Sequence, residues 1–251
     1  MRSYAIGDSH GQLDYMRAVH RWIADDRARV GDDSAPVIHL GDYVDRGPDS
    51  RGVLDHLLGG LAEGQPWILL KGNHDRMMSL FLRAPEERDP RRPDLHWLED
   101  RIGGRATLAS YGVDVSPARP VEEIHSEARG KVPPEHLALL EELRLSYCRG
   151  GVFFCHAGIR PGLALDQQVE DDLVWIRGEF HDDMRDHGAL IVHGHTPVEH
   201  VTHYGNRLNL DTGAAYGGPV SAVVIEGQEV FQLTQEGRCP IRPARWVFGA
   251  S

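Results

Sequence analysis

Five short blocks of the sequence each follow a run of apolar residues and carry side chains that can bind a metal ion. They are GDSHG, GDYVDRG, GNHD, CHAG and GHT, at residues 7–11, 41–47, 72–75, 155–158 and 194–196. An apolar run that ends in glycine and polar residues is typical of a strand that opens into a loop. Because functional groups collect where the strands of α/β proteins end, we expect the five blocks to meet.

The side chains of these blocks suggest a site for two metal ions. The candidate ligands are Asp8, His10, Asp42, Asn73, His156 and His195. Carboxylate, amide and imidazole donors suit Mn²⁺, Fe or Zn²⁺ and are poor ligands for Cu(I). Six ligands are too many for one closed tetrahedral site, whereas two ions that share a carboxylate use them all, about 3.5–4 Å apart. We expect two divalent ions, with Mn²⁺ preferred over Fe or Zn²⁺.

A pair of such ions favours phosphoester hydrolysis. A water held between two divalent cations loses its proton near neutral pH and becomes a nucleophile, so no phosphoenzyme is needed. His74, next to the ligand Asn73, is the candidate proton donor to the leaving oxygen, with Asp45 orienting its ring. Arg46 and Arg177 are candidates for binding phosphate oxygens, because a guanidinium can hold two of them at once. Asn73 is expected to contact the substrate as well as a metal ion.

The segments between the blocks predict the elements that position these groups. SYAIGD, PVIHLGD and PWILLKGNHD are strand-like, and each is followed by a segment with helical spacing, which indicates three strand-then-helix units. The apolar faces of the first two helices are predicted from Leu13, Met16, Val19 and Ile23 and from Leu54, Leu57, Leu58 and Leu61.

The second half of the sequence predicts an insertion and further strands. Residues 84–145 are rich in proline, arginine and glutamate, with short helical stretches such as DLHWLEDRI and PEHLALLEEL, and we expect a helical insertion over the core. GGVFFCHAG, ALIVHGHTP, NRLNLDTGA and PVSAVVIEGQEVFQLT predict a second, more antiparallel sheet. Without a repeat or linker, residues 1–251 are expected to form a single domain.

Composition excludes several classes of function. The chain of 251 residues has a net charge of −11 and no cluster of Lys or Arg, which argues against partners such as nucleic acid or anionic lipid. No apolar run reaches the roughly 20 residues of a membrane span, and no signal peptide is evident, so we expect a cytoplasmic protein without a membrane partner. Cys148, Cys155 and Cys239 form no CxxC pair and are expected to be buried free thiols.

The order of the five blocks resembles the metal-dependent phosphoprotein phosphatases, which have the calcineurin-like metallophosphoesterase fold. Their pattern is GDxHG, GDxVDRG, GNHE or GNHD, HGG or HAG, and GHT. The resemblance implies an α/β fold in which two mixed β-sheets pack face to face and are flanked by helices (α/β/β/α). It also implies that Asp8, His10 and Asp42 bind one ion and that Asp42, Asn73, His156 and His195 bind the other.

The resemblance is greatest to the bacterial and phage serine/threonine phosphatases, which share GNHD and HAG. It implies phosphorylated protein substrates, with phosphoserine, phosphothreonine or phosphotyrosine monoesters hydrolysed. The alternative is a symmetrical diadenosine tetraphosphate hydrolase or another small-molecule phosphoesterase. The bacterial diadenosine tetraphosphate hydrolases resemble GDxVARG at the second block, however, and Asp45 of this chain takes the place of the alanine. A non-enzymatic module that binds phosphopeptides is the third hypothesis, and a proton donor such as His74 argues against it.

Other polar residues are expected to be structural. His39 and His193 are interpreted as core residues, with support of a metal ligand as the alternative, and Cys155 as a buried thiol. Asp211 is left open between a turn residue and a support for a metal-binding histidine. Arginines of the insertion (Arg83, Arg88, Arg91 and Arg92) are interpreted as a solvated face, and Trp97 as a packing residue.

Overall fold

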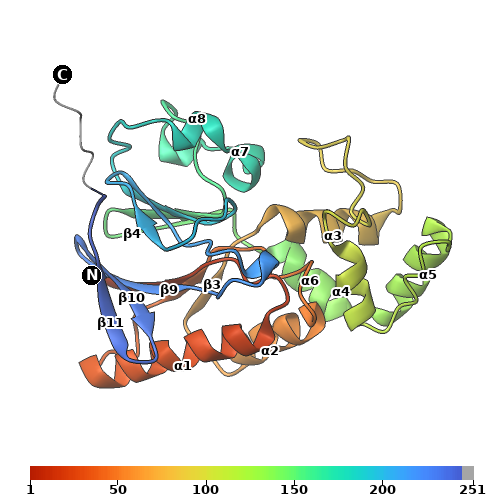
Figure 1. The fold of residues 1–251 in the computed structure, drawn as a ribbon, viewed down its shortest axis with the longest axis horizontal. Helices are drawn as coiled ribbons and strands as arrows, with labels where there is room; N and C mark the ends of the chain where they lie inside the picture. The colour runs from red at the N-terminus through yellow and green to blue at the C-terminus, as the bar shows by residue number, and fades with distance from the viewer. Residues whose placement is uncertain (245–251) are drawn as a thin grey trace.

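Two mixed β-sheets form the centre of the computed structural model, which describes residues 1–244 (Figure 1). The first sheet has the order β11 (Gly237–Ile241), β10 (Glu229–Thr234), β9 (Ala222–Glu226), β1 (Arg2–Ile6), β2 (Val37–His39) and β3 (Trp67–Leu69). The second has the order β4 (Ser146–Arg149), β5 (Val152–Cys155), β6 (Leu190–His193), β8 (Arg207–Asn209) and β7 (Thr202–His203). Strands β1 to β3 are parallel to one another, as are β5, β6 and β8.

The prediction of a more antiparallel second sheet was wrong. Strand β9 pairs antiparallel with β1, with Tyr4 opposite Val224, and the β9–β10 hairpin therefore extends the first sheet. The three strand-then-helix units leave one edge of β1 open, and an unpaired edge must be covered or paired. The second sheet has a parallel centre and antiparallel edge strands.

The alternation of side chains along the strands produces the four layers. Ala5 and Ile38 point to the second sheet, where they pack with Phe154 and Val192 in the core between the sheets. The intervening residues of the first sheet pack against helices on its outer face. A smaller cluster lies beneath the short helices on the outer face of the second sheet. The α/β/β/α arrangement expected from the sequence is thus confirmed.

The helices cover the outer faces of both sheets (Figure 1). Their bounds are α1 (Leu13–Val30), α2 (Ser50–Ala62), α3 (Asn73–Arg83), α4 (Gly104–Ser110), α5 (Val121–Lys131), α6 (Pro134–Glu142), α7 (Glu170–Trp175) and α8 (Gly178–His181). The predicted face of α1 is buried at Met16, Val19 and Ile23. On α2, Leu54 and Leu57 are buried, but Leu61 is exposed because it lies in the last turn of the helix.

The insertion contains three helices and one long loop. Helices α4, α5 and α6 lie within residues 84–145, at one end of the molecule beside α3 (Figure 1). The helix predicted for DLHWLEDRI is wrong, because residues 94–102 form consecutive turns. This loop directs Leu95, Trp97 and Leu98 inward, and all three are buried.

Candidate metal centre and active site

The five blocks lie at the ends of five strands, as the sequence predicted. Strands β1, β2 and β3 are followed by GDSHG, GDYVDRG and GNHD, and strands β5 and β6 by CHAG and GHT. The six candidate ligands are all buried, with no more than 6% of any of these residues exposed. Neighbouring parallel strands deliver their end residues to the same edge, which explains how distant residues meet.

The backbone is strained where these side chains converge. Within residues 1–244, the non-glycine residues with positive φ are His10, Asp42, Asp45, Arg46 and His195, at 42° to 74°. Such conformations cost roughly 1–3 kcal/mol each and persist where surrounding structure enforces them, which is common at active sites. All five residues belong to the blocks singled out in the sequence.

Three atoms with lone pairs lie around the Nε2 of His156, which makes a group of four. Its Nε2 lies 3.1 Å from Asn73 Oδ1, 3.2 Å from His195 Nδ1 and 3.4 Å from Asp42 Oδ2. Its Nδ1 lies 2.9 Å from the Leu40 carbonyl, which can only accept a hydrogen bond, so Nδ1 carries a proton. Burial lowers the pKa of His156, but the Asp42 carboxylate more than offsets this effect and raises it to about 10. This arrangement favours a positive charge among the four atoms.

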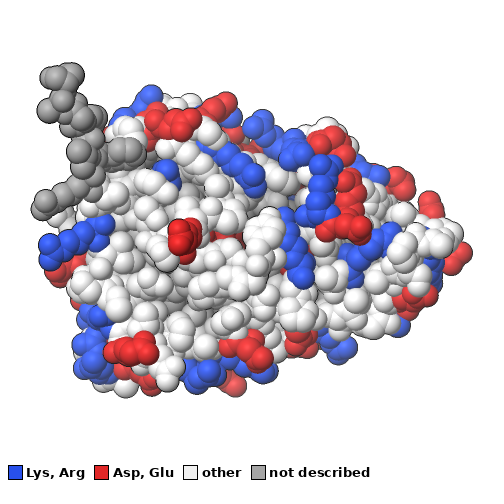
Figure 2. Space-filling view, in the orientation of Figure 1, with Lys and Arg blue, Asp and Glu red and all other residues white. Residues whose placement is uncertain are grey.

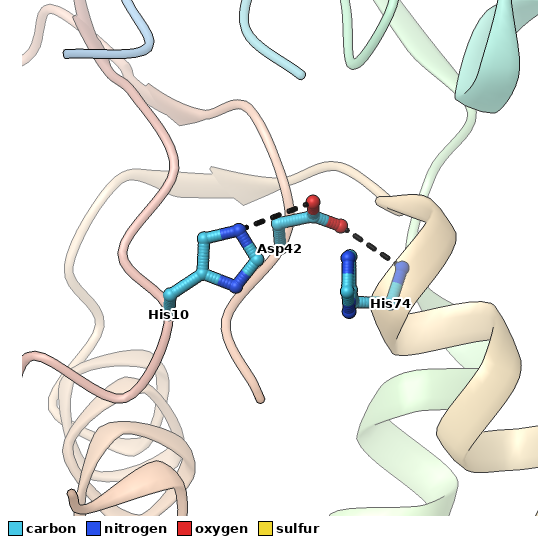
Figure 3. Close-up of side chains that lie close together, drawn as sticks. All are labelled: His10, Asp42 and His74. Atoms are coloured by element: carbon cyan, nitrogen blue, oxygen red, sulfur yellow. Dashed lines mark hydrogen bonds and ion pairs between the residues drawn. The ribbon is translucent and has the colours of Figure 1, made fainter. Parts of the chain in front are cut away.

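A second group of donors lies beside Asp42 (Figure 3). His10 Nε2 is 3.5 Å from Asp42 Oδ2, while His10 Nδ1 donates a hydrogen bond of 2.8 Å to the Val44 carbonyl. The same oxygen of Asp42 therefore approaches both His10 and His156. His74 completes a compact group with His10 and Asp42, and Asp42, His156 and His195 form the other. An oxygen shared between two groups is what a bridging ligand requires.

Asp8 supplies an oxygen that suits a cation. Its Oδ2 accepts a hydrogen bond of 3.0 Å from the His195 amide, but its Oδ1 is buried without a hydrogen-bond partner among the described residues. Burial and the nearby Asp211 carboxylate raise the pKa of Asp8 well above its ordinary value. A cation would relieve both the unpaired oxygen and the crowding of carboxylates. The donor set thus fits metal binding, although Asp8 lies outside the two compact groups and its assignment to one ion stays a prediction.

The predicted Asp45–His74 pair is formed. His74 Nδ1 and Asp45 Oδ2 are 2.6 Å apart, and Asp45 is fully buried. Asp45 also accepts hydrogen bonds from Trp97 Nε1, at 2.9 Å, and from the Thr107 hydroxyl, at 2.7 Å. These contacts fix the carboxylate, so that His74 donates a hydrogen bond to it from Nδ1. Nε2 is left free for a ligand in the cavity, which His74 lines.

Both predicted phosphate-binding arginines lie beside candidate metal ligands. Arg177 Nε donates to His195 Nε2 at 3.0 Å, and Arg46 Nη1 lies 3.4 Å from His10 Nε2. They line a cavity of about 250 Å³. Other predicted site residues on its wall are His10, Asp42, Asn73, His74 and His195.

Sequence reasoning missed several residues of the site. Buried Asp75 accepts hydrogen bonds from the amides of Asp42, Tyr43 and Gly72 at 2.8, 2.9 and 2.9 Å and so fixes the GDYVDRG turn. Burial and the Asp42 carboxylate raise the pKa of Asp75 to about 7. Its position in the first turn of α3 is a signal that could have revealed this role. Trp97 was expected only to pack, and it also bonds Asp45.

Two further arginines reach the cavity. Arg92, interpreted from the sequence as part of a solvated face, and Arg101 both lie on its wall. No local signal marks them, because they come from a loop whose path depends on distant contacts.

The remaining sequence predictions have mixed outcomes. The imidazole of His39 lies 3.4 Å from His20, and that of His193 lies 3.2 Å from Arg207, so both are core residues. Cys155 is buried as expected, but Cys148 and Cys239 are free and exposed, which contradicts the prediction of buried thiols. Asp211 forms a turn with Gly213 and also lines the cavity.

Comparison with known proteins identifies the family. The family model described as calcineurin-like phosphoesterase matches residues 1–225. The chain belongs to this family. Proteins that resemble it include one from Anoxybacillus flavithermus, 26% identical over 238 residues, which cover 87% of this chain and 88% of that protein. One from Bacillus thuringiensis is 25% identical over 245 residues, which cover 89% of this chain and 90% of that protein. Both are named bis(5'-nucleosyl)-tetraphosphatase PrpE, asymmetrical.

Solved structures show the same fold. A protein described provisionally as a diadenosine tetraphosphatase is 19% identical, with a TM-score of 0.63 and coverage of 97% of this chain and 95% of that one. A cold-active protein-tyrosine phosphatase from a psychrophilic Shewanella species is 16% identical, with a TM-score of 0.59 and coverage of 96% and 80%. Among residues 1–244, no helix combines the length and apolar character needed to cross a bilayer.

Proposed function

We propose that this phosphoesterase hydrolyses dinucleoside polyphosphates such as diadenosine tetraphosphate, releasing a nucleoside monophosphate and a nucleoside triphosphate. The observation that carries the proposal is the cavity wall, where Arg46, Arg92, Arg101 and Arg177 gather in a chain with a net charge of −11. Arg46 and Arg177 lie beside candidate metal ligands and serve one phosphoryl group. Arg92 and Arg101 are left for further phosphates.

The surface agrees with an extended anionic substrate. Figure 2 shows Lys and Arg side chains gathered where the α7 region faces the insertion. The names of the curated relatives support the same substrate class and the asymmetrical position of cleavage.

The residues of the site have distinct tasks in this reaction. Asp8, His10 and Asp42 would hold one divalent ion, and Asp42, Asn73, His156 and His195 the other. Two such ions, when bound, polarise the phosphoryl oxygens and lower the pKa of a bound water. Arg46 and Arg177 hold the oxygens of the attacked phosphoryl group, and Asn73 lies where it can also contact them.

The leaving group takes its proton from His74. Its Nδ1 is occupied by Asp45, so Nε2 is the nitrogen that can protonate the departing oxygen. Water attacks the phosphorus that becomes the nucleoside monophosphate and releases a proton to solvent. The bridging P–O bond breaks, its electron pair leaves with the oxygen of the nucleoside triphosphate, and that oxygen takes the proton from His74 Nε2.

Hydrolysis of phosphoproteins is the second candidate. The Asp45–His74 contact of 2.6 Å favours it, because an alkoxide leaving group from serine or threonine needs a proton more than a polyphosphate does. The GDxVDRG block of the phosphoprotein phosphatases points the same way.

One preparation loaded with Mn²⁺ can decide between these substrates. Its kcat/KM would be measured on diadenosine tetraphosphate, a phosphoserine peptide and a phosphotyrosine peptide, and the nucleotides separated by ion exchange. We expect the highest kcat/KM on the dinucleotide, with AMP and ATP in equal amounts. Two ADP would indicate symmetrical cleavage, and a higher kcat/KM on a peptide would support the second candidate. The Asp42→Asn variant is the control for contaminating phosphatase.

A further inference from the structure

A second hollow continues the cavity away from the candidate metal ligands. It has a volume of about 420 Å³ and shares Arg46, Arg101, Ala215 and Tyr216 with the cavity. Its far wall is formed by residues of the insertion: Asp100, Gly103, Arg105 and Ala106. The second hollow, which we call the distal groove, is thus continuous with the cavity, and Arg101 lies where the two meet.

The loop that carries Arg101 is anchored on both sides. Upstream, Arg76 binds the buried Asp89 through two hydrogen bonds of 2.8 and 2.7 Å. In the middle, Trp97 Nε1 donates to Asp45 at 2.9 Å. Downstream, Arg105 donates to the Leu98 carbonyl of this loop at 3.1 Å and to the Val115 carbonyl, between α4 and α5, at 2.7 Å. Arg101 therefore projects from a fixed frame, and binding a ligand there needs little ordering of the backbone.

Arg101 can exchange its present partner for a phosphate. Its Nε pairs with Glu99 at 2.9 Å, but the arginine side chain is 61% exposed, and exposed ion pairs of this kind are weak. The Arg101 carbonyl accepts a hydrogen bond of 3.5 Å from Arg46 Nη2, so the two arginines lie next to each other. Both arginines line the same cavity, where two guanidinium groups suit successive phosphates of one chain.

Tyr216 and Asp100 suit a nucleoside rather than more phosphate. The Tyr216 side chain is 71% exposed, and the Arg46 guanidinium lies 5.3 Å from the centre of its ring. An exposed aromatic ring beside a phosphate site can stack on a nucleobase. The Asp100 carboxylate can accept hydrogen bonds from ribose hydroxyls, as acidic residues do in other nucleotide sites.

We infer that the distal groove binds the part of the substrate beyond the scissile bond, with Arg101 on the phosphates and Tyr216 on the nucleobase. The inference rests on the proposed function, because it takes the substrate to be a nucleoside polyphosphate. It assigns to the insertion the selection of long substrates over simple phosphate monoesters.

Arg101→Gln and Tyr216→Ala test this assignment. At saturating Mn²⁺, each variant is expected to raise KM for diadenosine tetraphosphate about tenfold, as loss of one charge-assisted hydrogen bond or one base stack predicts. KM for p-nitrophenyl phosphate, which does not reach the groove, stays within about twofold, the scatter expected without a lost contact. Arg88→Gln, with the same charge change on the same loop but outside the cavity wall, is the matched control.

Inhibition by ATP separates failure of the groove from failure of the proposed function. ATP is expected to inhibit hydrolysis of p-nitrophenyl phosphate, with an inhibition constant about tenfold higher in Arg101→Gln than in the wild type and in Arg88→Gln. An equal constant in all three proteins would overturn the inference. If the wild type leaves diadenosine tetraphosphate intact while ATP inhibition still depends on Arg101, the groove stands and the proposed substrate is wrong.

Discussion

The hydrogen bond between His74 and Asp45 decides which nitrogen faces the substrate. Asp45 accepts three side-chain donors, from His74, Trp97 and Thr107. A carboxylate fixed in this way keeps one proton on Nδ1 and fixes the orientation of Nε2, and His74 can act as an acid when Nε2 also carries a proton. The proposed role of His74 as a proton donor therefore depends on the contacts that Trp97 and Thr107 make with Asp45.

The variant His74→Asn tests this role. The amide nitrogen of asparagine can still donate to Asp45, but the variant has no group that can transfer a proton. We expect kcat on an alkyl phosphate to fall by roughly 10²–10⁴, and less on p-nitrophenyl phosphate, whose leaving group needs less help from an acid. Metal content by mass spectrometry should be unchanged. An equal loss on both substrates would mean that His74 does not act as the acid.

Among the helices and loops, those of the predicted insertion contact the candidate catalytic residue Asp45 directly. Trp97 comes from the loop after α3 and Thr107 from α4, and both bond the Asp45 carboxylate. Ser50, at the start of α2, accepts a hydrogen bond of 3.2 Å from the Asp45 amide. Three elements thus converge on one turn whose backbone is strained.

The variant Trp97→Phe tests that support. It keeps most of the buried ring but removes the N–H donor to Asp45. We expect kcat to fall about tenfold with little change in KM, because substrate binding groups remain while the acid is less well oriented. The matched control is Trp22→Phe on α1, a partly buried tryptophan of the same core cluster. A rise in KM with kcat unchanged would contradict a positioning role.

Helices α1 and α2 also meet the first sheet through a group of histidines. His20 Nδ1 lies 2.8 Å from His56 Nε2, and the His20 ring stacks on Trp67 with 4.3 Å between ring centres. Burial, with smaller effects from His56 and Arg27, lowers the pKa of His20 to about 3. The folded protein therefore binds fewer protons here than the unfolded chain, whose histidines titrate near 6.5. The stability from this group is present above pH 6.5 and is lost as the pH falls toward 3.

The variant His20→Gln tests this dependence. Between pH 8 and pH 5.5, the free energy of unfolding of the wild type should fall by about 1 kcal/mol more than that of the variant. Urea unfolding at both pH values, in the same metal buffer, measures the difference. Parallel changes in the two proteins would exclude His20 as the source.

At the scale of the whole molecule, the sequence predicts contacts that are local and misses those that depend on packing. Helix α1 was predicted because Met16, Val19 and Ile23 repeat at helical spacing, which a few neighbouring residues determine. The pairing of β9 with β1 was not predicted, because the alternation of side chains along a strand does not determine which sheet edge that strand joins. Trp97 and Asp45 are 52 positions apart, and nothing near either residue signals their hydrogen bond.

The candidate ligands lie between these cases: their identity could be predicted from local sequence, but their convergence depends on the order of the strands. Each was recognisable because its block follows a strand, and the order of strands then brings the blocks together. The arginines of the insertion could not be found in this way, since Arg92 and Arg101 lie on a loop without regular structure. Its path depends on the contact between Arg76 and Asp89 and on buried Leu95 and Leu98.

The central claim is that side chains from five strand ends hold two divalent cations on either side of Asp42. Crystals grown with Mn²⁺ and measured at the manganese absorption edge test this claim most directly. We expect two anomalous peaks about 3.5–4 Å apart, with Asp42 Oδ2 within bonding distance of both. One peak alone, or peaks elsewhere on the surface, would contradict it.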